Sequence, residues 1–327
     1  MGLLFLSEAD VRSVLTIADL LEPMERALAG FSAGHVIQPV RPVVRSPAGP
    51  GLFAVMPACF PDQHTLGAKL VTVFGGNLRK GLPSHLAVVV LMDEQTGRLR
   101  ALMDGRYITE IRTAAVSAAA ARLLARDDAR ELAVLGSGVQ ARSHIAAIAL
   151  VRRLSGIRVW SPTVEHRERF VAEMQPGVAC PIAACASPEA CTRDADLIVT
   201  ATSSRTPVLH SGMVTDGAHV TAVGACRPDE RELDAALVWR GRLFVDSREA
   251  ALQEAGDVLL GIQEEMFGRD VIEAEIGDVI ARRVPGRHAR DEVTIFKSLG
   301  LAVEDLAAAE LAYSRARERG IGQPVEL

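Results

Sequence analysis

The sequence has few cysteines and none of the patterns in which cysteines usually bind metals or build disulfide frameworks. Five are present, an odd number, with no CxxC pair among them: Cys59, Cys180, Cys185, Cys191 and Cys226. A zinc site needs ligands at short, regular spacings, and a disulfide scaffold needs an even set of cysteines. We therefore expect reduced thiols, no metal and a cytoplasmic location.

Patterns for membrane or nucleic-acid binding are missing as well. The longest apolar runs, such as Leu86–Met92, are far shorter than the roughly 20 residues that span a bilayer. The start, Met1–Ser7, lacks the basic region of a secretion signal. Acidic residues outnumber basic ones by 41 to 36, for a net charge of −5, and no dense Lys/Arg block is present. We expect neither a membrane nor a nucleic acid as partner.

What the 327 residues do contain is 49% apolar sequence, enough for about two domains with ordinary cores. The first part predicts a strand at Leu3–Leu6 and a helix over Ile17–Phe31. β-rich runs follow between Leu52 and Met103, separated by Pro- and Gly-rich turns such as 46–51. Strands that alternate with turns indicate a mainly antiparallel sheet.

From residue 131 onward the pattern changes to alternating strands and helices. It predicts strands at Leu132–Leu135, Ile157–Trp160 and Leu197–Thr200, and a helix over Val164–Met174. Alternation of this kind is typical of a parallel sheet that helices cover on both faces.

The expected fold class is therefore α/β, with a Rossmann-type parallel sheet domain and a second, α+β domain. We assign residues 118–300 to the Rossmann domain, and residues 1–117 together with 301–327 to the α+β domain. This division returns the last predicted helix, Val303–Arg317, to the first domain.

The segment Leu132-Ala-Val-Leu-Gly-Ser-Gly-Val-Gln-Ala141 places a GxGxxA motif between a predicted strand and a predicted helix. In dinucleotide-binding domains the first glycine, here Gly136, permits a tight turn, and the second, here Gly138, lets the backbone approach a pyrophosphate. The following helix presents free N–H groups to the phosphates. This context favours an NAD(P) site over an ordinary turn.

The residues after the next strand are expected to bind the cofactor's ribose. An acidic residue there would bind the 2′-hydroxyl of NAD, but Val159–Thr163 contains none. Ser161 and Thr163 could instead bind a 2′-phosphate, with His166 or Arg167 supplying charge, which favours NADPH and leaves NADH as the alternative. The candidate cofactor contacts are Gly136, Ser137, Gly138, Val139, Gln140, Ser161, Thr163, Arg167, Thr200, Ala201, Thr202, Val223 and Gly224.

Three cations precede the nucleotide motif. Lys69 lies inside the apolar run Leu66–Val73, Arg112 precedes a stretch of small apolar residues, and Arg41 lies further upstream. A buried cation without an anion is costly, so each must pair inside the protein, reach solvent or bind an anionic ligand. Together the three would form a socket for a carboxylate, which an arginine can bind through two parallel hydrogen bonds.

Several longer segments carry a resemblance to a known family. They include Val55-Met-Pro-Ala58, Ala68-Lys-Leu-Val-Thr72, Leu82-Pro-Ser-His85, Ile108-Thr-Glu-Ile-Arg-Thr-Ala-Ala-Val-Ser-Ala118, Leu135-Gly-Ser-Gly-Val-Gln-Ala141, Ala222-Val-Gly-Ala-Cys-Arg-Pro-Asp-Glu-Arg-Glu-Leu-Asp234 and Thr294-Ile-Phe-Lys-Ser-Leu-Gly-Leu-Ala-Val-Glu-Asp305. Through them the chain resembles the ornithine cyclodeaminase/mu-crystallin family, and more closely its mu-crystallin (ketimine reductase) branch.

The resemblance implies a homodimer in which the α+β domain binds substrate and forms the dimer. It implies that Arg41, Lys69 and Arg112 hold the substrate carboxylate, with Arg45 as the alternative to Arg41. Further positions near the substrate are matched by Met56, Ser84 and His85.

Cys226 departs from the cyclodeaminase pattern, in which an aspartate occupies this position and acts as a base. A thiol cannot replace a carboxylate in accepting an ammonium. Ala54 likewise stands where the cyclodeaminases have an acidic residue that faces the amine of ornithine. Cyclodeamination is therefore disfavoured, and Cys226 is kept as a candidate substrate contact.

Reduction of a cyclic ketimine is the leading interpretation. Hydride from NAD(P)H would reach the α-carbon of pyrroline-2-carboxylate or piperideine-2-carboxylate, giving L-proline or L-pipecolate. The imine would bring its own proton or receive one from His85, which could equally be a packed histidine. The catalytic candidates are thus Lys69, Arg112 and His85. The alternatives are an ornithine cyclodeaminase, an alanine-type amino-acid dehydrogenase, and a non-catalytic NADP-dependent protein that binds a small ligand.

Overall fold

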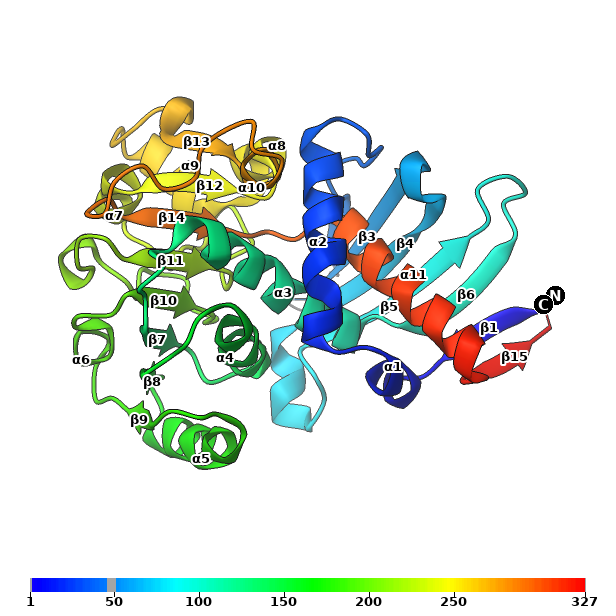
Figure 1. Cartoon of the computed structure of the whole chain (residues 1–327), viewed down its shortest axis with the longest axis horizontal. Helices are drawn as coiled ribbons and strands as arrows, with labels where there is room; N and C mark the ends of the chain where they lie inside the picture. Colours follow the sequence, from blue (N-terminus) through cyan, green and yellow to red (C-terminus); the bar gives the residue numbers. More distant parts are fainter. Residues whose placement is uncertain (1, 46–50, 327) are drawn as a thin grey trace. The chain divides into compact units, whose positions relative to one another are not determined.

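The computed structural model describes residues 2–45 and 51–326 (Figure 1). They form two compact units: unit 1 runs up to Arg112 and resumes at Gly300, and unit 2 comprises Thr113–Leu299. The boundary expected after residue 117 falls inside helix α3, Arg106–Leu124, which passes from one unit into the other. Of the turn expected at 46–51, residues 46–50 lie outside the described residues.

Unit 1 contains a seven-stranded sheet in the order β15-β1-β6-β5-β4-β3-β2. Neighbouring strands are antiparallel except β1 and β6, which are parallel, so the prediction of a mainly antiparallel sheet is confirmed. The strands are β1 Leu3–Leu6, β2 Val43–Arg45, β3 Gly51–Phe60, β4 Thr65–Phe74, β5 His85–Met92, β6 Leu99–Asp104 and β15 Gln323–Val325.

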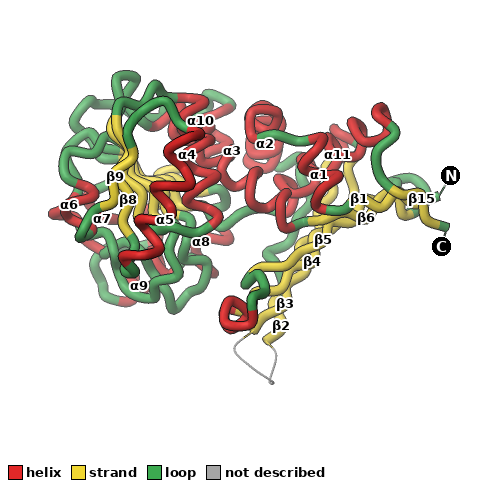
Figure 2. The backbone as a smooth tube through the Cα atoms, turned by 90° about the horizontal axis from the view of Figure 1, so that it is seen from below, coloured by secondary structure: helices red, strands yellow, loops and turns green. Residues whose placement is uncertain are grey.

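Three helices of unit 1 cover one face of this sheet: α1 Glu8–Val14, α2 Ile17–Ser32 and α11 Ala302–Arg319 (Figure 2). α1 begins with a capping box, in which Ser7 and Asp10 each bind the other's backbone N–H group. α11 packs against α2 and strands β3, β4 and β5, although each of them lies more than about 200 residues earlier in the sequence. The last helix therefore lies in the same unit as the first two helices of the chain.

The opposite face of the sheet carries no helix among the described residues of unit 1 (Figure 2). Side chains along a strand alternate between the two faces. On β3, Ala54 and Met56 are buried, while their neighbour Phe53 is 36% exposed. On β5, Leu86 and Val88 are 42% and 38% exposed. This uncovered face therefore presents large apolar side chains to its surroundings.

Unit 2 contains an eight-stranded, wholly parallel sheet in the order β13-β12-β14-β11-β10-β7-β8-β9. The order reverses between β7 and β10, which is the switch point of a Rossmann-type sheet. The strands are β7 Glu131–Leu135, β8 Gly156–Trp160, β9 Ile182–Ala184, β10 Leu197–Thr200, β11 His219–Ala222, β12 Arg242–Val245, β13 Ile272–Glu275 and β14 Thr294–Lys297.

Helices pack on both faces of this sheet and enclose two hydrophobic cores. α3, α4 and α5 lie over one face, and α6 and α7 over the other (Figures 1 and 2). The helices after α3 are α4 Val139–Val151, α5 Val164–Met174, α6 Pro188–Thr192, α7 Ala235–Arg240, α8 Arg248–Glu254, α9 Gly256–Gln263 and α10 Ile276–Ile280. The predicted α/β class with a Rossmann-type domain is confirmed.

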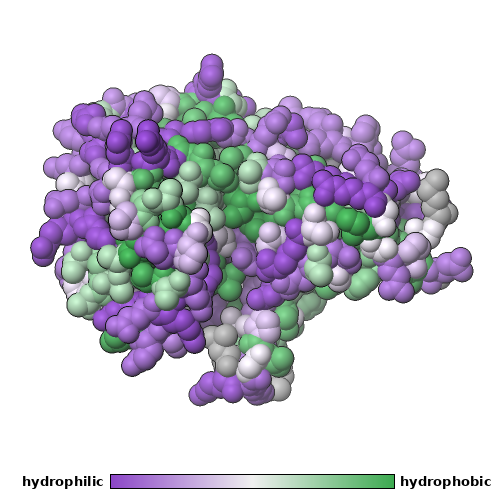
Figure 3. Space-filling model, turned by 60° about the horizontal axis from the view of Figure 1, so that its bottom comes forward, coloured by the Kyte–Doolittle hydropathy of each residue, from purple (hydrophilic) through white to green (hydrophobic). Residues whose placement is uncertain are grey.

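Hydrophilic side chains make up most of the molecular face shown in Figure 3, with hydrophobic patches between them. Among the helices of residues 2–45 and 51–326, none is both long enough and apolar enough to cross a membrane.

Candidate active site

Two carboxylates of α11 bind two of the predicted substrate cations. Lys69 Nζ lies 2.6 Å from Asp305 Oδ2. Arg112 donates through Nε to Asp305 Oδ1 at 2.9 Å and through Nη1 to Glu304 Oε2 at 2.7 Å. The four side chains are at most 5% exposed. Both cations thus pair inside the protein, one of the outcomes that the sequence had left open.

The local folds explain why these side chains meet. Lys69 lies on β4 directly opposite Met56 of β3, on the helix-covered face of the sheet. Thr109 and Arg112 are three residues apart on α3 and therefore face the same side of that helix. Thr109 Oγ1 lies 3.5 Å from Lys69 Nζ and donates to the Gly105 carbonyl. An ammonium has three N–H donors, and Thr109 Oγ1 accepts from one of those on Lys69.

The charges in this cluster shift the pKa values of its members. Burial lowers the pKa of Lys69 to about 8; the nearby Asp305 carboxylate opposes this shift, and Arg112 and Arg41 add to it. Burial alone would raise the pKa of Asp305, but the charges of Arg112 and Lys69 outweigh it and hold that pKa below its usual value. At neutral pH Lys69 and Asp305 are therefore both charged.

His85 starts β5 on the same face of the sheet as Lys69. Burial lowers the pKa of His85 to about 4, and the positive charges of Lys69 and Arg112 contribute to this shift. The imidazole is therefore neutral at pH 7.

Arg41 and Ser84 are further predicted substrate residues of unit 1. Arg41 is half-buried and close enough for its charge to affect the pKa of Lys69, whereas Arg45 is exposed on β2. This difference favours Arg41 over Arg45. Ser84 precedes β5 and is half-buried, and its carbonyl accepts from the N–H group of Phe74 at 2.7 Å.

The sequence reasoning missed the residues of unit 1 that hold these cations in place. Glu304 and Asp305 are the third and fourth residues of α11 and are fully buried. The sequence does contain a signal for them. Two adjacent carboxylates lie in the first turn of a helix, between the apolar residues Val303 and Leu306. Gln38 was missed too; its Oε1 accepts from the Val303 N–H group at 2.9 Å.

In unit 2, the glycine turn has the geometry of a pyrophosphate site. Gly136 has a φ of +126°, and a Cβ there would lie 2.4 Å from the Ala201 carbonyl oxygen. A Cβ on Gly138 would meet nothing within 4 Å, so this position leaves room for a ligand beside the backbone. Gly138 also caps α4 without a side-chain hydrogen bond. These residues fit the diphosphate of a dinucleotide.

The end of β8 brings together the predicted ribose residues. Ser161 is 5% exposed, and its hydroxyl donates to the Thr163 carbonyl at 3.3 Å. Arg167, on α5, donates through Nη1 to the Ser161 carbonyl at 3.1 Å. The Arg167 guanidinium and the Ser161 hydroxyl therefore lie near each other at this end of the strand, and Val159–Thr163 contains no acidic residue.

The ends of β10 and β11 carry the other predicted cofactor residues. Thr200, Thr202 and Gly224 all donate hydrogen bonds to one carboxylate, that of Glu232, which the sequence reasoning missed. Cys226 follows in the loop after β11, half-buried, and its Sγ lies 3.6 Å from the Val223 carbonyl oxygen.

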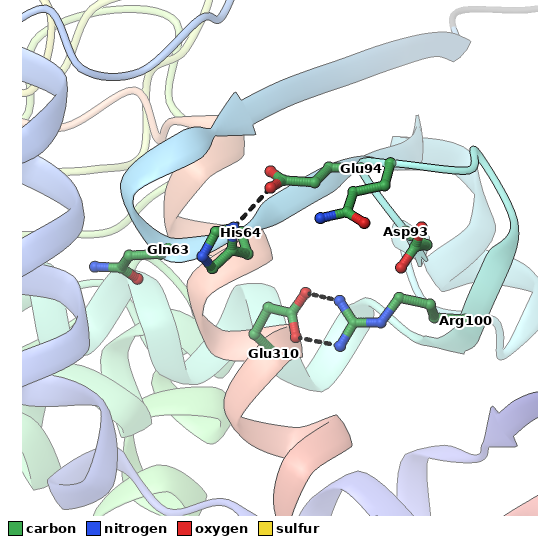
Figure 4. Close-up of a pocket in the computed structure, with 7 residues that line it drawn as sticks. Gln63, His64, Asp93, Glu94, Arg100 and Glu310 are labelled. Carbon is green, nitrogen blue, oxygen red and sulfur yellow. Dashed lines mark hydrogen bonds and ion pairs between the residues drawn. The ribbon is translucent and has the colours of Figure 1, made fainter.

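Unit 1 also has a cavity of about 350 Å³ that contains none of the predicted site residues (Figure 4). Four of its lining residues pair with one another: His64 lies 2.6 Å from Glu94, and Arg100 donates to both oxygens of Glu310. We assign no function to this cavity.

Comparisons with known proteins find relatives along nearly the whole chain. The model of the ornithine cyclodeaminase/mu-crystallin family matches residues 2–320. The ketimine reductase mu-crystallin of Mus musculus is 44% identical over 313 residues, which are 94% of this chain and 96% of that protein.

Two solved structures match over the whole fold. One is the Δ1-pyrroline-2-carboxylate reductase of Thermococcus litoralis, in complex with NADH and L-proline. It has a TM-score of 0.97 and 35% identity, and the match covers 99% of this chain and 100% of that one. The other is an archaeal alanine dehydrogenase dimer with bound NAD, with a TM-score of 0.94, 29% identity and full coverage of both chains.

Proposed function

We propose that this chain, which belongs to the ornithine cyclodeaminase/mu-crystallin family, is an NAD(P)H-dependent oxidoreductase that reduces the C=N bond of a cyclic imino acid. The observation that carries the proposal is the buried cluster of Lys69 and Arg112 on the helix-covered face of a sheet. A pair of buried cations suits an anionic substrate, and the glycine turn suits a dinucleotide.

The cations of the cluster suit a carboxylate ligand. Asp305 and Glu304 hold Lys69 and Arg112 in fixed positions, and Arg41 is close enough for its charge to affect the pKa of Lys69. An arginine can bind a carboxylate through two parallel hydrogen bonds. Because the side chains of Lys69 and Arg112 are fixed, a carboxylate bound to them and the imine carbon beside it would be held in one orientation.

The protein need not supply a proton at pH 7. When bound, NAD(P)H supplies the hydride. A protonated imine accepts that hydride at carbon, and its C=N electron pair becomes the lone pair of the amine, so the step balances without an added proton. His85 is neutral, and we propose that its ring makes a hydrogen bond to the ring nitrogen of the substrate.

The proposed substrates are pyrroline-2-carboxylate and piperideine-2-carboxylate, which give L-proline and L-pipecolate. The names of the mouse and Thermococcus litoralis relatives support this class. Cys226 and Ala54 disfavour cyclodeamination, because neither is an acid. The likeness to alanine dehydrogenase supports a second candidate, the reductive amination of pyruvate with ammonia.

NADPH is the proposed cofactor. Ser161, Thr163 and Arg167 meet at the end of β8 and would bind a 2′-phosphate, whereas no carboxylate lies in Val159–Thr163 to bind a 2′-hydroxyl. NADH is the alternative, and the Thermococcus litoralis relative was solved with it.

A homodimer formed through unit 1 is part of the proposal. Phe53, Leu86 and Val88 lie on the uncovered face of the seven-stranded sheet, and exposed apolar faces of this kind mark interaction surfaces. The occupant we propose is the same face of a second copy, because a twofold axis pairs a surface with itself. The cytoplasmic location expected from the sequence stays a prediction.

The test is to follow NADPH and NADH oxidation by the purified chain with pyrroline-2-carboxylate, piperideine-2-carboxylate, and pyruvate plus ammonia, and to follow L-ornithine conversion separately. We expect the largest kcat/KM with a cyclic imine. A larger value with pyruvate plus ammonia would favour the dehydrogenase. Turnover of ornithine alone would favour a cyclodeaminase, and no turnover with any of these compounds would favour a binding protein.

A further inference from the structure

We propose that Glu232 is a positioning residue for the nicotinamide half of the cofactor site, and that it does this by binding the loops after β10 and β11 to one buried carboxylate. This inference rests on the cofactor part of the proposed function. Its test uses binding alone, so it does not depend on the identity of the imino acid.

Glu232 binds both loops with both of its oxygens. Oε1 accepts from the N–H group of Thr202 at 2.7 Å and from its hydroxyl at 2.8 Å. Oε2 accepts from the N–H group of Gly224 at 2.7 Å and from the Thr200 hydroxyl at 2.9 Å. Backbone N–H groups can only donate, so each carboxylate oxygen must act as an acceptor.

The two loops are also packed tightly against each other at this point. A Cβ on Gly224 would lie 2.3 Å from the Thr202 carbonyl oxygen and 2.4 Å from Glu232 Oε1. Only glycine fits there. The backbones of the two loops approach so closely that any side chain at position 224 would clash. The Glu232 carboxylate, which binds both loops, therefore fixes the distance between them.

Two further buried charged residues, Asp257 and Lys297, bind the backbone of Glu232 and of the loop after β11. Asp257 Oδ1 accepts from the backbone N–H group of Glu232 at 2.8 Å. Lys297 Nζ lies 2.8 Å from Asp257 Oδ2 and donates to the Ala225 carbonyl at 2.5 Å. Burial raises the pKa of Glu232 and Asp257 adds to the shift, while Lys297 opposes it. Lys297 therefore favours the charged form of Glu232 and also holds the loop after β11.

The position of these loops indicates which half of the cofactor they would contact. In a Rossmann-type sheet the dinucleotide lies across the carboxyl ends of the strands at the switch point, with one mononucleotide on each half. The adenosine half belongs to the side of β7 and β8, where Ser161 lies. β10 and β11 form the other half, so the Glu232 loops belong to the nicotinamide side.

The experiment compares two ligands by isothermal titration calorimetry: NADPH, which occupies both halves, and 2′,5′-ADP, which occupies only the adenosine half. In Glu232→Gln, an amide NH₂ group replaces one of the two acceptors and faces donors. The two loops then lose hydrogen bonds to a charged acceptor and are no longer held in the position that fits the nicotinamide half. We therefore expect NADPH affinity to fall at least roughly tenfold. The affinity for 2′,5′-ADP should change by less than about twofold.

A milder variant covers the case in which Glu232→Gln does not fold. Thr200→Val keeps the side-chain shape and removes only the 2.9 Å hydrogen bond to Oε2. We expect a smaller loss of NADPH affinity, of about threefold to tenfold, and again no change for 2′,5′-ADP.

The matched control is His219→Asn, at the opposite end of β11. His219 is 1% exposed and binds the hydroxyls of Thr294 and Thr221, so its loss disturbs the same strand away from the loops. We expect a lower melting temperature with unchanged affinity for both ligands. The proposal is overturned if the folded Glu232 and Thr200 variants lose affinity for both ligands in parallel, or for neither. If the native chain binds neither ligand, the cofactor assignment itself fails.

Discussion

Gly300 leaves just enough room for the guanidinium of Arg112. A Cβ on Gly300 would lie 2.6 Å from Nη1 and 2.7 Å from Nη2 of Arg112, and the residue has a φ of +82°. Space and backbone conformation both require glycine here. The chain enters α11 at this point, so Gly300 lets Arg112 reach Glu304 and Asp305 in the first turn of the helix.

We predict that Gly300→Ala destabilises the protein by about 1–3 kcal/mol and lowers kcat/KM for the imino acid, because the added methyl group displaces the guanidinium. The control is Gly320→Ala. Gly320 ends α11 with a φ of +66°, but a Cβ there would meet nothing within 4 Å, so this variant tests backbone strain alone. Melting curves and steady-state rates of both variants check the prediction, and equal losses of kcat/KM would contradict it.

The pKa of Lys69 predicts a fall in activity at alkaline pH. This pKa is lowered to about 8, so the ammonium is charged below that value and loses its charge as the pH rises through it. Affinity for a carboxylate should follow, and kcat/KM for the imino acid should decline above pH 8 while NADPH affinity stays constant. In Lys69→Arg the side chain remains charged, so the decline should move to higher pH. An unchanged decline would assign it to deprotonation of the imine instead.

Arg167 should select between the two nicotinamide cofactors. Because it lies against Ser161 at the end of β8, we expect Arg167→Ala to weaken NADPH binding about tenfold and leave NADH binding unchanged. Arg169→Ala is the control, since Arg169 lies on the same helix, is 66% exposed and pairs with Glu173. Fluorescence titration with both cofactors checks this, and equal losses for NADH and NADPH would argue against a 2′-phosphate contact.

The uncovered face of the seven-stranded sheet should form the dimer. Leu86→Asp places a charge on that face, and we expect the native dimer to become a monomer because a buried carboxylate without a partner is costly. The control is Leu150→Asp on α4 of unit 2, where Leu150 is 50% exposed. Light scattering coupled to size-exclusion chromatography gives the molar mass. A monomeric native chain, or a dimer that survives Leu86→Asp, would refute this interface.

Elements with a strong local pattern could be predicted closely. The helix Val164–Met174 and the strand Leu197–Thr200 have the predicted bounds, because apolar spacing and flanking residues define them locally. The missed strands include β9 and β14. Unlike Leu197–Thr200, neither begins with a run of three large apolar residues, since β9 is Ile-Ala-Ala and β14 is Thr-Ile-Phe-Lys. Their pairing with other strands, such as that of β14 with β11 and β12, appears only in the folded chain.

In the candidate site, too, residues with a local sequence signal could be predicted, and residues defined only by the fold could not. Lys69 and Arg112 could be singled out because a cation in an apolar stretch is unusual, and Gly136 because the motif is local. Glu304 and Asp305 could not be assigned as their partners, since about 190 to 240 residues separate them and only the folded chain brings them together. Glu232 was missed because its role depends on loops from two other strands.

The most direct test of the account is the loss caused by Lys69→Ala and Arg112→Ala in the reduction of pyrroline-2-carboxylate. We predict that kcat/KM falls roughly 100-fold or more in each, because a buried charge is removed from the carboxylate site, while NADPH affinity is unchanged. Arg100→Ala is the control, because it breaks the Arg100–Glu310 pair elsewhere on α11. If folded Lys69→Ala and Arg112→Ala retain the kcat/KM of Arg100→Ala, the two cations do not bind the substrate carboxylate.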